Sequence, residues 1–148
     1  MRQVQALISS QKERGIVVPN PDFDWVTALY ACTPAKVFEQ LRLDVQKDVE
    51  TRNKLRPKGA NYEFHLVERG ETFTVISVNN YGDGKAEFTL TETGITIKDS
   101  LGRTFEACLT LNDKGECITK IEGKEYELWQ LRKLALEDLF ANRARQMP

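Results

Sequence analysis

His65 is the single histidine of this 148-residue chain. A histidine general base, a catalytic triad or a histidine metal site would therefore have to use it. It alternates with Tyr62, Phe64 and Leu66, so it falls on the opposite face of its predicted strand. Neither a Gly-x-Ser-x-Gly motif nor a His-Glu-x-x-His motif accompanies it. The pattern favours a structural His65, and we predict no catalytic residue, no metal site and no cofactor.

A second group of polar and aromatic residues could line a pocket for a small ligand. Two carboxylates that stand two residues apart can do acid–base or metal chemistry, although either of them can instead cap a helix that follows. Aromatic residues of the N-terminal half and of the closing segment would add apolar walls, but a solid core needs the same residues. The candidate ligand-binding residues are Asp22, Asp24, Trp25, Tyr30, His65 and Tyr81, with Glu63 as a further acid.

Positive charge is densest at Arg52, Lys54, Arg56 and Lys58. Such a patch could bind phosphate groups, nucleic acid or an acidic partner. Cations are also favoured at the C-terminal end of a helix, where these residues are predicted to lie. Only Tyr62 stands near them as a stacking aromatic, so a platform for single strands is poorly supported. The segment 79–85 does not have the spacing of a phosphate-binding loop, and it is predicted to be a turn.

The composition is that of an ordinary globular protein, with 41% hydrophobic and 29% charged residues. A net charge of −1 argues against nucleic-acid binding over the whole surface. No apolar run approaches a membrane span, and the first residues lack a continuous apolar stretch, so we expect no membrane contact and no signal peptide. The cysteines Cys32, Cys108 and Cys117 are odd in number. We therefore expect reduced thiols in a cytoplasmic protein, with Cys108 and Cys117 packed in one hairpin.

The elements that would position these residues follow from periodicity. Apolar residues recur at spacings of three and four in segments 2–14 and 34–55, and again in the segment 126–142. Thr33 and Pro34 mark the start of the second of these helices, and a short helix with Trp25 and Leu29 precedes it. Between the helical regions, short alternating runs joined by tight turns predict antiparallel strands. These runs are 62–67, 72–78, 86–91, 95–97, 104–111 and 117–121.

The predicted fold class is α+β, in one domain over residues 1–148. N-terminal helices (1–58) are followed by a curled antiparallel meander of about six strands (61–123) and a closing C-terminal helix (125–142). The periodicity leaves open whether the sheet closes towards a barrel.

Three functions remain open. The first is a non-enzymatic binding or assembly module that contacts a protein partner or a second copy of itself, in the simplest form through the helix at 2–14. The second is a ligand-binding or enzymatic domain with a pocket between helices and sheet. The third, which we consider weakest, is nucleic-acid binding through the 52–58 patch.

Overall fold

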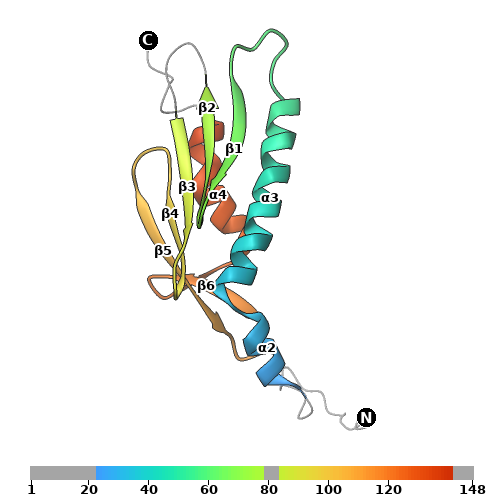
Figure 1. Ribbon diagram of the computed structural model, residues 1–148, viewed down its shortest axis with the longest axis vertical. Helices are drawn as coiled ribbons and strands as arrows, with labels where there is room; N and C mark the ends of the chain where they lie inside the picture. The colour runs from blue at the N-terminus through green and yellow to red at the C-terminus, as the bar shows by residue number, and fades with distance from the viewer. Residues whose placement is uncertain (1–22, 79–83, 142–148) are drawn as a thin grey trace.

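The computed structural model describes residues 23–78 and 84–141. The predicted helix at 2–14, the candidates Asp22 and Tyr81, and most of the predicted turn at 79–85 lie outside this range. Within it, three helices and seven strands follow one another along the chain (Figure 1). They are α2 (Trp25–Ala31), α3 (Pro34–Lys54), β1 (Glu63–Arg69), β2 (Thr72–Val78), β3 (Gly84–Leu90), β4 (Gly94–Lys98), β5 (Thr104–Leu111), β6 (Cys117–Ile121), β7 (Lys124–Tyr126) and α4 (Leu128–Phe140).

The strands form one antiparallel sheet in the order β1-β2-β3-β4-β5-β6-β7. Every strand thus pairs with its neighbours in sequence, as the tight turns predicted, and the sheet is open rather than closed. The predicted α+β class and meander are confirmed. The strand missing from the prediction is β7, whose three residues pair with 119–121 of β6. Its hairpin turns at Glu122 and Gly123, which both have positive φ, as a two-residue type I′ turn requires.

The helices α3 and α4 pack against one face of the sheet, so that face is buried. Phe73 stacks on Phe88 across the register of β2 and β3, with ring centroids 4.6 Å apart. Phe38 of α3 packs on Phe73, and Phe140 of α4 packs on Phe64 of β1. These rings join both helices to the sheet in a single core.

The predicted boundaries of α3 agree with the structure because its capping residues are unambiguous. The Thr33 hydroxyl accepts a hydrogen bond from the Lys36 N–H, and Pro34 occupies the first helical position. The buried side of α3 consists of the predicted stripe residues Phe38, Leu41, Val45 and Val49.

Asn53, near the end of α3, is bonded to the outer edge of the sheet. Its side-chain NH₂ donates to the Phe64 carbonyl at 2.9 Å, and its side-chain oxygen accepts from the Phe64 N–H at 3.0 Å. The Asn53 amide therefore does for β1 what another strand would do, because it satisfies both backbone groups of one edge residue.

An ionic cluster with two buried carboxylates fixes α4 to the turn between β4 and β5. The Arg103 guanidinium donates to Asp99 at 2.7 Å and to Asp138 of α4 at 2.8 Å. Asp99 also accepts from the backbone N–H groups of Leu101 and Arg103. Both carboxylates are buried, so this pairing offsets the cost of removing their charges from water.

Candidate interaction surface

Helix α2 forms because Asp24 caps it. The Asp24 carboxylate accepts hydrogen bonds from the Thr27 hydroxyl at 2.6 Å and from the Thr27 N–H at 3.0 Å. These bonds, the hydroxyl's first, hold the pKa of Asp24 below its ordinary value, because they favour the charged form. Of the two functions considered for the 22–24 carboxylates, the structure gives Asp24 the capping role.

None of the seven residues of α2 is buried. Trp25, Val26, Leu29 and Tyr30 expose 60%, 57%, 49% and 71% of their surface. We call these four side chains the α2 surface. Single exposed apolar residues are common on proteins, but four on one short helix form a contiguous patch of the kind that marks interaction sites.

Trp25 and Tyr30, which we named as candidates for a pocket against the sheet, are largely exposed on α2, which lies at the periphery of the molecule (Figure 1). Phe38, from the same predicted aromatic group, belongs to the core. The Lys36 ammonium lies 4.6 Å from the centre of the Tyr30 ring, which places a cation at the border of the α2 surface.

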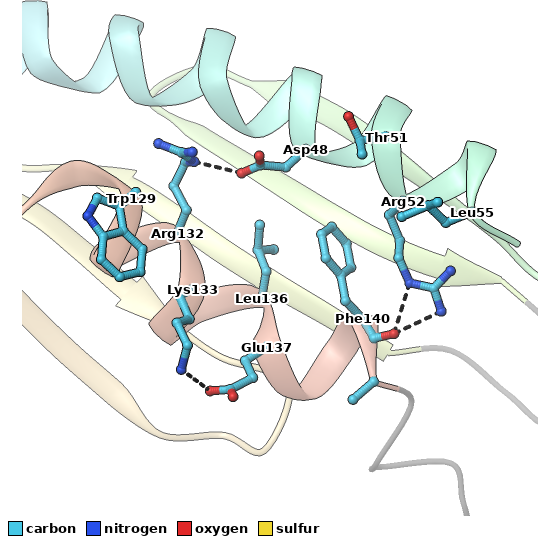
Figure 2. Close-up of a pocket in the computed structure, with 11 residues that line it drawn as sticks. Asp48, Thr51, Arg52, Leu55, Trp129, Arg132, Lys133, Leu136, Glu137 and Phe140 are labelled. Carbon is cyan, nitrogen blue, oxygen red and sulfur yellow. Dashed lines mark hydrogen bonds and ion pairs between the residues drawn. The ribbon is translucent and has the colours of Figure 1, made fainter.

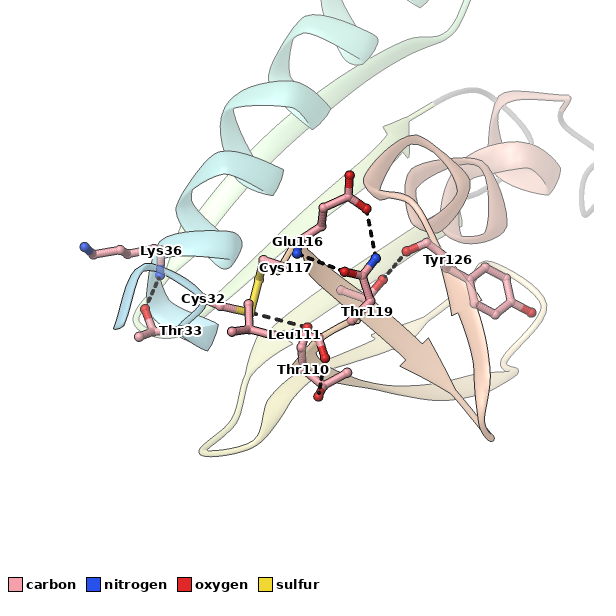
Figure 3. Close-up of a disulfide and its surroundings, with 10 residues drawn as sticks. Cys32, Thr33, Lys36, Thr110, Leu111, Glu116, Cys117, Thr119 and Tyr126 are labelled. Carbon is pink, nitrogen blue, oxygen red and sulfur yellow. Dashed lines mark hydrogen bonds between the residues drawn. A yellow bond between two sulfur atoms is a disulfide. The ribbon is translucent and has the colours of Figure 1, made fainter. Parts of the chain in front are cut away.

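A disulfide between Cys32 and Cys117 attaches the C-terminal end of α2 to the start of β6 (Figure 3). The prediction of reduced thiols is therefore wrong for these two cysteines. Sequence spacing could not reveal the pair, because its members are 85 residues apart and meet only when α3 packs along the sheet. Cys108 is a free thiol and is exposed, so the prediction that it packs inside its hairpin is also wrong.

At the other end of α2, the Phe23 ring lies over Gly115 in the turn between β5 and β6. A Cβ atom added to Gly115 would lie 2.3 Å from this ring, so only glycine allows the approach. Gly115 also has φ +79°, a left-handed backbone conformation that favours glycine. Helix α2 is thus held at both of its ends, with the α2 surface between them.

The remaining ligand candidate in the described range, His65, lies on β1 opposite Ile76, on the face that the helices do not cover. Its Nε2 is 3.7 Å from the Glu63 carboxylate, and both side chains are 52% exposed. This is the face that the alternation predicted. Among the described residues, no hydrogen bond, ion pair or ring contact joins His65 to Asp24, Trp25 or Tyr30, so the structure does not assemble these four candidates into one site.

Two arginines of the basic patch have a structural role. Arg52 donates to the Phe140 carbonyl through Nε at 3.0 Å and through Nη2 at 2.9 Å, and also to the Tyr62 hydroxyl. Arg56 donates to the Tyr62 and Asn53 carbonyls. These two guanidinium groups join the end of α3 to β1 and α4. Lys54 and Lys58 lie at the same end of the helix and are exposed.

Two cavities lie beside the helices. One, of about 550 Å³, lies between α3 and α4, with Leu136 and Phe140 in its floor and the exposed Trp129 at one end (Figure 2). The Arg132–Asp48 pair spans it at 2.6 Å. The other, of about 770 Å³, lies beside the disulfide, between the start of α3 and the segment from β7 to α4. Neither is lined by Asp24, Trp25, Tyr30 or His65.

In the part of the chain that the structure describes, no cluster of three or more His, Cys, Asp or Glu side chains could hold a metal ion. None of the described helices combines the length and the apolar character that crossing a membrane requires. Comparison of the chain with protein-family models, with curated proteins and with solved structures finds no match.

Proposed function

We propose that the protein is a non-enzymatic binding or assembly module whose contact site is the α2 surface. The observation that carries this proposal is the exposure of four large apolar side chains on a helix with no buried residue. Burying such side chains against a partner removes apolar area from water, which is the dominant favourable term in protein association.

The partner that we favour is a second copy of the chain. None of the four side chains is charged, so two α2 surfaces can meet about a two-fold axis without repulsion between like charges. The segment 2–14, which we predicted as a self-association helix, lies outside the described residues.

The compartment is part of the proposal. Disulfides persist in oxidising environments and are rare in the cytosol. The Cys32–Cys117 bond therefore favours an oxidising compartment over the cytoplasm that we expected from the cysteine count.

Light scattering on a size-exclusion column, over a range of protein concentrations, tests the proposal. The wild type should exceed the monomer mass of 16.9 kDa, and the double variant W25S/L29S should elute at that mass. Leu101→Ser is the matched control, because Leu101 is 50% exposed in a turn far from α2 and its loss should leave the mass unchanged. A wild type that stays monomeric at every concentration would contradict self-association.

Ligand binding is the second candidate, and the cavity beside the disulfide favours it. Its volume of about 770 Å³ is within the usual range for small-molecule sites. Native mass spectrometry of gently purified protein would show a bound small molecule as added mass on the monomer. A bare monomer peak would argue against this function.

Nucleic-acid binding through Arg52, Lys54, Arg56 and Lys58 is the weakest candidate. The two arginines already donate to backbone carbonyls, which leaves fewer of their N–H groups for phosphate. Any such binding should weaken steeply as salt rises, because phosphate contacts release counterions.

A further inference from the structure

The position of α2 depends on few contacts other than the disulfide. The helix buries no residue, and its carboxylate cap is bonded within the helix rather than to the body of the protein. Beyond the chain connection through Thr33 to α3, its main attachments among the described residues are the Cys32–Cys117 bond, the Phe23 ring on Gly115 and the contact of the Lys36 ammonium with the Tyr30 ring, and it lies beside β5 and β6. Elements with few buried apolar contacts open at low free-energy cost.

The two cysteines of the disulfide differ in exposure. Cys117 is exposed, whereas Cys32 is only 8% exposed. A thiolate from solvent can therefore reach the Cys117 sulfur more readily, with Cys32 as the leaving group. The Cys32 sulfur lies 3.6 Å from the Thr110 carbonyl, which can accept a hydrogen bond from the thiol once it is reduced (Figure 3).

We propose that the Cys32–Cys117 disulfide controls the α2 surface by its redox state, an inference that rests on the proposed binding function. A dithiol reductant attacks the Cys117 sulfur and forms a mixed disulfide, and the Cys32 thiolate leaves and takes up a proton. The second thiol of the reductant then displaces the Cys117 thiolate, which is protonated in turn. Two electrons pass to the protein, and the reductant becomes a disulfide.

Reduction frees α2 to move about its connection to α3, because it breaks the covalent link at the C-terminal end of the helix, and the contacts of α2 that remain among the described residues, such as that of Phe23, are non-covalent. The four side chains of the α2 surface lose their fixed arrangement, and ordering them again upon association costs conformational entropy. The oxidised protein is thus the binding-competent form.

The experiment uses the full chain with Cys108→Ser, so that the free thiol cannot exchange with the disulfide. Hydrogen–deuterium exchange is followed in the peptides that cover α2, α3 and α4, before and after reduction with dithiothreitol, with the redox state verified by intact mass. We expect exchange in 24–31 to rise by about tenfold on reduction, with α3 and α4 unchanged. The variant C32S/C117S in the same background should match the reduced protein without any reductant.

Association is measured on the same samples by light scattering. The expected result is a loss of affinity of about tenfold or more on reduction. If exchange in 24–31 does not change, or if association is equally strong in both states, redox control is overturned while the proposed function stands. If neither the oxidised nor the reduced protein associates, the proposed self-association fails, and its regulation by the disulfide fails with it. If α3 and α4 also lose protection, reduction unfolds the protein and the proposal of a local control is overturned.

Discussion

At the scale of single residues, Asn53 shows how one side chain completes a secondary structure. Its amide satisfies both the N–H and the carbonyl of Phe64, a residue that is 1% exposed. Asn53→Ala would leave these two backbone groups without their partner, at a cost of about 1–3 kcal/mol for each group that water does not reach. Urea denaturation should therefore show a clear loss of unfolding free energy.

The matched control for Asn53→Ala is Gln46→Ala on the same helix, since Gln46 bonds only to the exposed Glu50. It should change the free energy of unfolding by no more than about 0.5 kcal/mol. Equal effects of the two substitutions would show that the Asn53 bonds contribute nothing specific.

Gly94 is a second residue on which the fold depends. A Cβ atom placed there would lie 1.8 Å from the Ala107 carbonyl oxygen of the paired strand β5, and a backbone atom cannot move away cheaply. Gly94→Ala should destabilise the protein by about 3 kcal/mol or more, at the upper end of overpacking effects.

Gly102→Ala provides the comparison for Gly94→Ala. Gly102 has open space around it and φ +87°, so its substitution carries only the cost of left-handed backbone, about 1–2 kcal/mol. Thermal unfolding of both variants measures how much more stability Gly94→Ala loses than Gly102→Ala. A Gly102→Ala protein that is the less stable of the two would contradict this account.

At the scale of elements, the stability of helix α2 should fall at acid pH, because its N-terminal cap is the carboxylate of Asp24. The Thr27 hydroxyl and N–H lower the pKa of Asp24 in the folded protein, whereas the unfolded chain has the ordinary value of about 3.9. The stabilisation is therefore complete above that ordinary value and is lost as the pH falls through the lowered pKa. Carboxyl titration by NMR, together with the exchange of α2 amides, measures both effects.

Thr27→Val tests the cause of this shift. It removes the hydroxyl bond and keeps the N–H bond, so the pKa of Asp24 should rise towards its ordinary value without reaching it. If Asp24 titrates identically in Thr27→Val and in the wild type, the hydroxyl is not the main cause.

Elements with strong local signals could be predicted from the sequence, and their relations in space could not. The boundaries of β2, β5 and β6 agree with the predicted runs, because alternation and glycine turns define them. The strand β7 was missed because three residues are too few for a period to be recognised. The closing helix predicted over 125–142 begins too early for the same reason, since residues 125 and 126 belong to β7 and α4 begins at Leu128.

The candidate site was harder to predict than the fold. Periodicity places an apolar residue on one side of an element, but it does not say whether another element covers that side. The pattern therefore predicts that Trp25 and Leu29 face inward, although nothing in the described part of the chain buries them. The disulfide has no local signal at all, since it joins two elements that only the folded core brings together.

At the scale of the whole molecule, the disulfide is a long-range link in a fold of sequential neighbours. It closes a loop of 85 residues and so restricts the unfolded chain strongly. We expect C32S/C117S, in the Cys108→Ser background, to unfold with about 2–4 kcal/mol less free energy than the same background with the bond intact. Calorimetry measures the corresponding decrease in melting temperature, and an unchanged melting temperature would contradict the expectation.

The two edges of the sheet have a consequence for colloidal behaviour. An open sheet offers unpaired backbone groups to other chains, and such edges seed aggregation. Here the Asn53 amide and the Arg56 guanidinium occupy backbone groups at the start of the β1 edge, and the opposite edge is only three residues long. The end of α3 thus hinders strand-to-strand pairing at the start of this edge, and the self-association that we propose would use side chains on a helix rather than exposed backbone.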